Sequence, residues 1–482
     1  MSEAIQSAGA VNIERIDLLT SPEAGSQTID LTDYVGQIII QESIFTNYFT
    51  MELGMGDARN LIGNVPIVGG EIVTIRLVSK HLKGENRNNI IEQSFIVHSI
   101  TDRNYATDRE QTYIMKCITP EGYKNNTVVI NERFTGSPRS IFNDIYERFI
   151  KEPKIIGKGK DNSVQGKPLQ FLSGGNPFKR DSFTFNSNYW TPYRCMNFLA
   201  GKVAPADLDK PLMPNTRYFQ SDKSHYVVSL SRLNAFYKEN GVIYDEFNSL
   251  PANDEPFILN EKRKQHSGYT YSSPFVSSQY NTMSGLTIPQ YTNDLEDQIS
   301  GYQGNMTVGF DMTTRLPHHM EFDYTPKHRA RLSENKRVIP TGYQDFFHIE
   351  KRTPQKFSPI SNPKSALNVR IGSSQIWNDQ PFGYDWRMLQ DVAFRDTAVE
   401  ELKRLRIEFG CAGRTDVDLG MLVSLNFPNT QEKGGGTSAD DVYDKRVSGL
   451  YTITGLRHTI TTATQDHQMR LTCVRDSMGD ME

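Results

Sequence analysis

Several features that would assign a function are scarce or missing in this sequence. Its 482 residues include only four cysteines, Cys117, Cys195, Cys411 and Cys473, whose separations match no metal or redox motif. We therefore expect reduced thiols and synthesis in a cytosol. No run of about 18 apolar residues occurs, so we expect no helical membrane span. The first residues carry neither a basic nor an apolar region, so we expect no secretory signal.

Charge and composition exclude further classes. The formal net charge is −4 and the isoelectric point is about 6.2, so the basic surface typical of nucleic-acid-binding proteins is missing. A mean hydropathy of −0.54, with 35 Gly, 23 Pro and 22 Tyr, is typical of a loop-rich β protein with large polar surfaces. The length predicts about two to four domains.

Residues that could ligate a metal cluster at one place in the sequence. His318, His319, Glu321, Asp323 and His328 lie close together, and imidazole with carboxylate could hold zinc or iron. However, they do not form a helical His-Glu-x-x-His motif, and adjacent histidines point to opposite sides of an extended chain. We therefore interpret this segment as a surface or interface loop and predict no metal ligands.

Other candidates for chemistry are equally weak. Cys117 and Cys473 occupy matching strand positions, where a small buried apolar role fits better than that of a nucleophile. Glu42 and Glu52 could form a glycosidase pair only if the fold brings them together. The glycine-rich loop 433–437 does not end in the adjacent lysine and hydroxyl residues of a phosphate-binding loop, and no helix is expected after it. We predict no catalytic and no cofactor-binding residues, and no cofactor.

Two segments more than three hundred residues apart share a faint repeat. Gly70–Leu77 resembles Gly420–Phe427 position by position, and Glu52-Leu53-Gly54 resembles Glu408-Phe409-Gly410. The separation of Phe95 from Cys117 equals that of Tyr451 from Cys473. The blocks keep their order while the spacers differ, as expected when loops vary more than strands. We interpret the repeat as a duplicated β unit; chance similarity between hairpins is the alternative.

The repeated blocks have the period of strands. Ile72, Thr74 and Arg76 alternate with Val73, Ile75 and Leu77, which predicts a strand with two unlike faces. Segments 94–100 and 113–118 predict a hairpin with a polar turn at 102–108. Segments 451–456 and 469–474 predict its counterpart, with residues 463–466 near the tip.

Helix signals interrupt the β pattern between the two copies. Ser137 with Pro138, and Thr191 with Pro192, predict two helix starts. A strand is expected over 226–233, and a third helix over about 389–405. The stretch 237–380 is rich in Asn, Ser, Gly, Pro and Tyr and only weakly periodic, so we expect an insertion ordered chiefly by partners.

These patterns predict a mainly β chain with some helix (α+β) in four parts. We expect a first β-barrel over 1–126 and an inserted helix-containing α+β domain over 127–262. A loop-rich segment over 263–385 would partly complete the second barrel and the inserted domain. The second β-barrel would cover 386–482.

The motifs at both ends resemble a known family. Glu42-Ser43-Ile44 followed by Phe49–Asp57 resembles the early strands of baseplate central hub proteins from contractile-tailed bacteriophages. A helix, then Arg406–Cys411 and Asp418–Phe427, resembles the tube-like C-terminal domain of these hubs, and 447–476 would be its closing hairpin. The resemblance implies two tube-protein-like barrels related by internal duplication. It covers the ends well and 237–380 poorly.

The resemblance implies a structural, non-enzymatic virion protein. A homotrimer with two tube-like barrels per chain offers six similar units. It could therefore adapt the hexameric tail tube, or a tube-initiator ring, to a trimeric cell-puncturing spike. Its channel would pass DNA without sequence-specific binding. Tape measure and baseplate wedge proteins would be further partners. The protein would be assembled in the host cytoplasm and reside in the tail baseplate.

Three alternatives remain open at this stage. The chain could be the hub or spike base of a type VI secretion system or a related contractile injection system. Because such hubs often continue into a β-helical needle and this chain ends soon after the second barrel, we expect a separate spike protein. It could also be a receptor- or glycan-binding tail module, given its 22 Tyr and polar middle. The third alternative is a metal-dependent hydrolase that uses the His318 region.

Overall fold

The computed structural model describes most of both ends of the chain and several elements between them. The described residues are 9–20, 27–65, 67–80, 90–107, 109–151, 167–172, 177–178, 182–203, 206, 216–230, 232–233, 236, 243–249, 282–290, 304–311, 315–323, 366–372, 395, 405–427 and 447–475.

Strands dominate, and thirteen of them form one sheet in the order β19-β13-β14-β18-β21-β20-β3-β4-β7-β6-β5-β1-β2. Seven come from the first part of the chain: β1 (Val11–Leu19), β2 (Thr28–Asp30), β3 (Val35–Ser43), β4 (Thr50–Asp57), β5 (Ile72–Ser79), β6 (Ile90–Thr107) and β7 (Glu110–Ile118). Six come from later parts: β13 (Ile243–Ser249), β14 (Thr282–Gln290), β18 (Leu405–Ala412), β19 (Leu422–Asn426), β20 (Gly449–Thr461) and β21 (Asp466–Arg475). The mainly β prediction is confirmed.

Alternation along the strands follows the sequence. On β4, Met51, Leu53 and Met55 are buried, while the residues between them are partly exposed. The β5 strand shows the same period because Val73 and Ile75 point inward. One face of each of these two strands therefore builds a core, and the other stays partly exposed.

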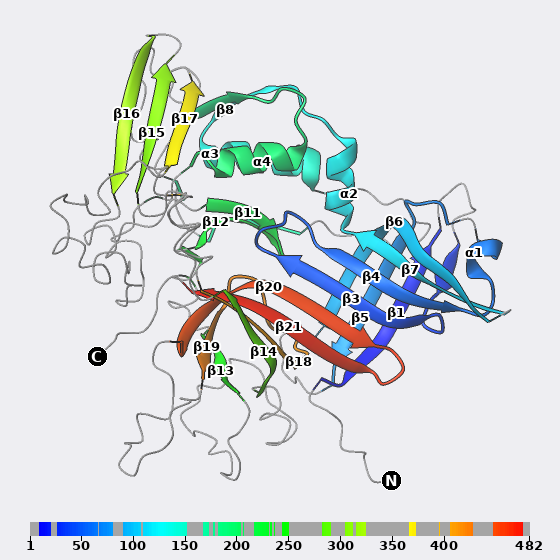
Figure 1. Cartoon of the computed structure of the whole chain (residues 1–482). Helices are drawn as coiled ribbons and strands as arrows, with labels where there is room; N and C mark the ends of the chain where they lie inside the picture. Colours follow the sequence, from blue (N-terminus) through cyan, green and yellow to red (C-terminus); the bar gives the residue numbers. More distant parts are fainter. Residues whose placement is uncertain are drawn as a thin grey trace, which may run out of the picture.

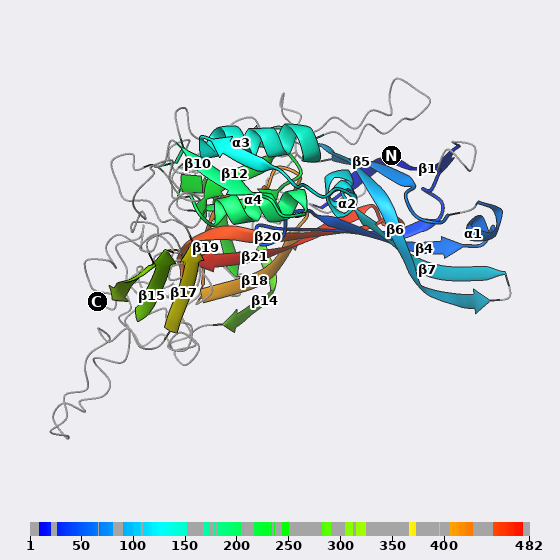
Figure 2. The same ribbon diagram turned by 90° about the horizontal axis from the view of Figure 1, so that it is seen from above.

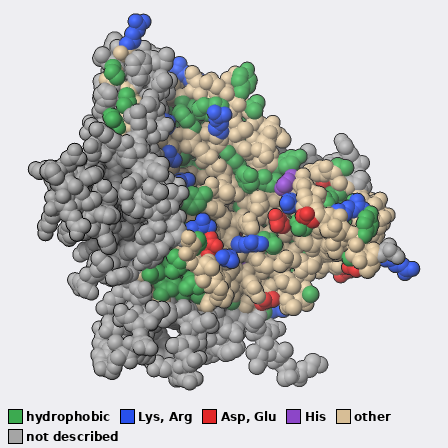
Figure 3. Space-filling model, in the orientation of Figure 1, with side chains coloured by type: hydrophobic (Ala, Val, Ile, Leu, Met, Phe, Trp, Pro, Cys, Tyr) green, Lys and Arg blue, Asp and Glu red, His purple; other side chains and the backbone are tan. Residues whose placement is uncertain are grey.

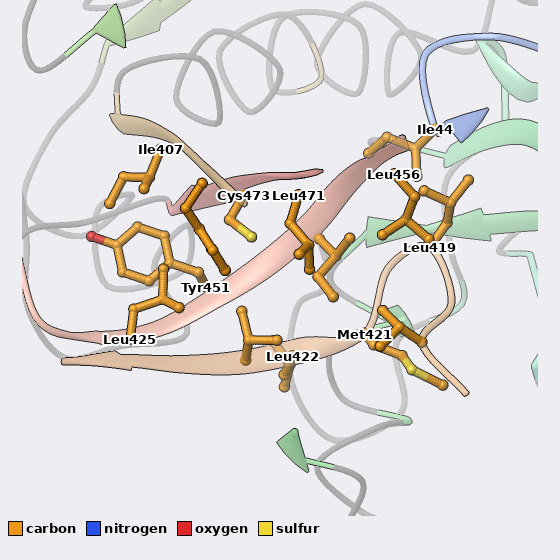
Figure 4. Close-up of a cluster of buried hydrophobic side chains, with 14 of the residues drawn as sticks. Ile44, Ile407, Leu419, Met421, Leu422, Leu425, Tyr451, Leu456, Leu471 and Cys473 are labelled. Carbon is orange, nitrogen blue, oxygen red and sulfur yellow. The ribbon is translucent and has the colours of Figure 1, made fainter. Parts of the chain in front are cut away.

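The later strands close on themselves. β13 pairs with β14 and β19, β14 with β18, β18 with β21, and β20 with both β21 and β19. Inside this ring lies a buried apolar cluster that includes Leu422, Tyr451 and Leu471 (Figure 4).

A second apolar cluster lies within the earlier strands, and it includes Ile38, Leu53, Val73 and Phe95. The hairpin β20–β21 helps to enclose it. At the tip of that hairpin, the amide of Val11 donates to the carbonyl of Gln465 at 2.9 Å, and His467 donates to Gly9 at 2.8 Å. Backbone contacts therefore run from β3 through β4, β7, β6, β5 and β1 back to the hairpin.

The two halves are joined by antiparallel pairing of β3 with β20, from Gly455 opposite Ser43 to Thr461 opposite Gln37. Figure 1 shows the long β20–β21 hairpin beside β3, and Figure 2 shows the same strands from above. The cores also exchange residues. Ile460 of β20 packs in the earlier cluster, and Ile44, just after β3, packs in the later one.

Helices and short strands cover one side of this sheet near the junction (Figure 1). Ser137 caps α3, since its hydroxyl accepts from the amide of Ser140 at 3.1 Å, and Pro192 opens α4, so both predicted starts are confirmed. A third apolar cluster, with Phe142 and Met196, lies here. The elements are α2 (Pro120–Thr127), β8 (Arg133–Gly136), α3 (Pro138–Ile145), the π-helix η3 (Tyr146–Ile150), β9 (Leu169–Gln170), β10 (Phe183–Asn186), α4 (Pro192–Ala200), β11 (Thr216–Gln220) and β12 (His225–Ser229).

The remaining elements are α1 (Leu61–Asn64) and a small sheet. In that sheet, β15 (Gly304–Asp311) lies between β16 (Leu316–Asp323) and β17 (Ala366–Gly372). Among the residues that the structure describes, no helix is both long and apolar enough to cross a membrane.

Several local predictions need correction. The strand expected over 226–233 ends at Ser229, because the described residues that follow, including Leu230, are helical. The turn expected at 102–108 is shorter, since β6 continues to Thr107. Most of the helix expected over 389–405 lies outside the described residues; Arg395 is helical, but Leu405 already begins β18. Most of 237–380 also lies outside them, although β13 to β17 fall within it.

A charged side chain placed in either core should destabilise the fold. Val423 is fully buried in the later cluster, so Val423→Asp would place an unpaired carboxylate among apolar side chains. We expect it to destabilise the chain by at least about 3 kcal/mol in denaturant unfolding. Ser424→Asp, on the neighbouring half-buried position, is the matched control and should cost much less. Equal unfolding curves for the two variants would contradict the inward orientation of Val423.

Candidate functional site

A buried carboxylate cluster lies where three parts of the chain meet. Glu42 comes from the end of β3, Asp222 from the turn between β11 and β12, and Asp418 from the loop between β18 and β19. One carboxylate oxygen of each lies within 4.8 Å of the others. The amide of Asp222 donates to Glu42 Oε2 at 3.2 Å, and the amide of Leu419 donates to Asp418 Oδ1 at 2.8 Å. Backbone donors therefore fix this arrangement.

Two lysines lie beside the cluster. Lys223 Nζ is 4.0 Å from Asp418 Oδ2. Lys167 Nζ donates to the carbonyl of Ser221 at 2.9 Å and lies 4.3 Å from the centre of the Phe49 ring. Burial lowers the pKa of Lys167, while the carboxylates around it oppose that shift.

Glu42 and Asp418 hold their protons more tightly than usual, because the pKa of each is raised. Burial raises the pKa of Glu42 well above its ordinary value, and the charges of Asp222 and Asp418 raise it further. Burial also raises the pKa of Asp418, against the attraction of Lys223. Three negative charges in one buried site repel one another. Protonation of part of the cluster therefore lowers its electrostatic free energy.

A pair of histidines continues the cluster along β20 and β21. His458 Nε2 is 3.9 Å from Glu42 Oε1, and His458 Nδ1 lies 3.0 Å from His467 Nε2. Burial lowers the pKa of His458 to about 4, and it lowers the pKa of His467 well below its usual value. Both rings are therefore neutral near pH 7, and one donates to the other.

A second buried polar group lies near Lys167, whose charge acts on Glu121. His225 Nε2 is 3.9 Å from Glu121 Oε1, and His225 Nδ1 lies 2.9 Å from the hydroxyl of Tyr218. Gln220 donates to Glu121 Oε2 at 3.1 Å. Burial lowers the pKa of His225, although Glu121 opposes this. The β11–β12 hairpin is thus fastened to α2 by polar contacts.

This arrangement suits a structural junction. Three carboxylates at this spacing could bridge a divalent cation, but Lys167 and Lys223 already supply positive charge there. A cysteine nucleophile would need a lowered pKa. Instead, burial raises the pKa of both Cys195 and Cys411 to about 12.

The candidates from the sequence are not brought together. Glu42 is buried at the junction, whereas Glu52 lies opposite Ile39 on the other face of the β3–β4 pair. Cys117 and Cys473 are both fully buried, as their positions predict. The structure describes the remaining candidates only in part.

The sequence predicts a loop for the histidine segment, but His318, His319, Glu321 and Asp323 lie in strand β16, where His318 lies opposite Gly309 and His319 opposite Val308. Their side chains, the whole of His328 and the loop 433–437 lie outside the described residues. The expectation of no catalytic, cofactor or metal residues stays a prediction.

Sequence reasoning missed the junction cluster. Glu42, Asp222 and Asp418 come from distant segments, and none belongs to a local motif. The available signal was the polar turn Ser221–Ser224 between two strands rich in buried aromatic and β-branched residues.

Comparison with known proteins gives matches in structure alone. No protein-family model matches the sequence, and no curated protein matches it. The tail protein from Neisseria meningitidis MC58 superposes with a TM-score of 0.50 at 9% identity, covering 96% of each chain. The 43 kDa tail protein of prophage MuSo2 from Shewanella oneidensis has a TM-score of 0.48 at 10% identity, covering 96% of this chain and 99% of that one. The chain therefore has a fold similar to that of the Neisseria tail protein.

The raised pKa of Glu42 makes a prediction about pH. The native state holds this proton more tightly than the unfolded chain, so Glu42 contributes stability at low pH that is lost as the pH rises above about 5. Glu42→Gln keeps an acceptor for Asp222 and removes the charge. We expect the variant to gain stability relative to wild type as the pH rises above about 5 in denaturant unfolding. Exposed Glu110→Gln is the control, and parallel profiles for all three proteins would contradict the prediction.

Proposed function

We propose that this protein is a structural component of a contractile tail, the trimeric baseplate hub that adapts the hexameric tube to a trimeric spike. The observation that carries the proposal is the agreement in strand pairing between the two repeated segments. The likeness in fold to a tail protein supports it.

The pairings correspond element by element. β4 pairs with β7 as β18 pairs with β21, so that Met51 faces Cys117 and Ile407 faces Cys473. A second correspondence relates β6–β7 to β20–β21.

The pairing of β5 with β6 likewise corresponds to that of β19 with β20. Val73 faces Phe95, and Val423 faces Tyr451. Even the glycine before each strand has a left-handed backbone, with φ of 96° at Gly70 and 82° at Gly420. This agreement supports a duplicated β unit.

The junction sets the two units side by side. Because β3 pairs with β20, each chain presents both units in one continuous sheet. Three such chains around an axis would offer six similar units to a hexameric tube and keep threefold symmetry for a spike. The protein would act without catalysis, and DNA would pass through the channel without sequence-specific contacts.

The proposal also specifies the partners and the location of the protein. Its partners would be the tail tube or its initiator ring, a separate trimeric spike, and tape measure and wedge proteins. The mature location would be the virion baseplate, after assembly in the host cytoplasm. A hub of a type VI secretion system or related injection system would share the same geometry.

A glycan- or receptor-binding tail module is the second candidate. It is favoured by exposed tyrosines, since Tyr105 and Tyr189 are 76% and 72% accessible. Binding to a glycan panel, without affinity for tube or spike proteins, would favour this candidate over the hub.

Native mass tests the hub directly. We expect light scattering to give three times the 54.8 kDa chain mass, for the chain alone or after co-expression with the tube and spike proteins of the same tail. Ser424→Asp should keep the trimer, and Val423→Asp should lose it. A folded monomer under both conditions would remove the symmetry argument.

A further inference from the structure

An open groove runs along the junction, on the polar face of the sheet. It has a volume of about 940 Å³ and is lined by residues of β3, β18, β20 and β21, together with the segment that follows β3. Phe45 and Tyr48 of that segment form part of its wall. The groove is therefore built from both ends of the chain and exists only when they are joined.

Positive charge exceeds negative charge in the groove. Arg406, Arg457 and Arg470 line it, against Glu408 and the buried Glu42. Glu408 contacts both Arg406 and Arg470, the latter at 3.0 Å. Figure 3 shows Lys or Arg side chains and acidic side chains close together near the middle of the viewed face.

The arginines keep capacity for a ligand. The side chains of Arg406 and Arg470 are 49% and 50% accessible, and one carboxylate satisfies only part of their donors. Arg457 is exposed and forms no ion pair with any residue in the described part of the chain. The chain as a whole has a net charge of −4, so the groove differs from it by its local excess of positive charge.

An aromatic wall adds a second kind of contact. Phe45 is 48% exposed, and the guanidinium of Arg217 lies 4.9 Å from the centre of its ring. Arg217 Nε is buried and has no hydrogen-bond partner among the residues that the structure describes. Burial and then the charge of Arg395 lower the pKa of Arg217 to about 10. An anion beside Phe45 would relieve this repulsion.

We propose that this groove binds an acidic peptide segment of a neighbouring protein, one with carboxylates for the arginines and an apolar side chain for Phe45. Arg457 and Arg470 would bind carboxylates, for which the planar guanidinium is well shaped. This partner would bind whether or not the chain acts as a tail hub.

Nucleic acid fits the groove less well. A duplex binds through a long row of basic residues that contact many phosphates. Here only three arginines line the groove, two of them already share Glu408, and the wall is aromatic, so few cations are available for a row of phosphates. An acidic peptide can place its charges between these groups and keep its apolar side chains against Phe45.

The experiment measures binding of a fluorescein-labelled peptide of alternating glutamate and phenylalanine to the full chain by anisotropy. The matched control peptide has glutamine in place of glutamate. We expect saturable binding of the acidic peptide alone, weakened when NaCl rises from about 0.1 M to about 0.5 M.

Variants locate the site. Arg457→Gln should weaken binding roughly two- to fivefold, and Arg457→Gln with Arg470→Gln should weaken it further. Phe45→Ser should also reduce affinity. Arg109→Gln, an exposed arginine at the β6–β7 turn, should leave it unchanged. Circular dichroism confirms that each variant folds.

Three results would overturn the proposal. One is no saturable binding by the folded wild type. Another is binding that the groove variants and Arg109→Gln change equally. The third is a duplex DNA probe that binds as tightly as the peptide and depends on the same arginines, which would assign the groove to polyanions in general.

Discussion

The antiparallel pairing of β3 with β20 is the contact on which the rest of the structure depends. It joins strands whose residues are more than four hundred positions apart and turns two sets of strands into one sheet. Without it, β3 and β20 would each present unpaired backbone groups, which invite pairing with other chains. It also brings Glu42 beside His458 and sets Gln41 next to Arg457. The buried cluster and the open groove therefore both lie at this pairing of β3 with β20, which we call the seam.

Much of the fold follows from local patterns. Alternation at Ile72–Leu77 indicates a strand, and Ser137 with Pro138 marks a helix start, because these signals depend on neighbours in sequence. The seam has no such signal. Nothing near residues 37–43 indicates pairing with 455–461, since strand partners are chosen by the packing of whole units. The same holds for the junction acids, because Asp222 and Asp418 are ordinary turn residues until the fold brings them together.

Buried charge at the seam costs stability and restricts how the parts can meet. Glu42, Asp222 and Asp418 would repel one another in any arrangement that lacked Lys167, Lys223 and the backbone donors. An apolar seam would tolerate slippage of the hairpin along β3, whereas these acids require a particular register. The exchange of Ile44 and Ile460 between the two cores has the same effect through shape. Polar and apolar contacts thus specify one relative position of the halves.

The seam also governs how the protein forms on the ribosome. Synthesis proceeds from the N-terminus, so β3 emerges long before β20, its partner. The β3 edge of the first unit stays without its β20 partner while several hundred residues are synthesised. Contacts between segments so distant in sequence also form slowly. Apolar residues around β3, such as Ile38 and Ile40, lack part of their final cover during this time. The nascent chain is therefore most prone to mispairing just before its last hairpin is released.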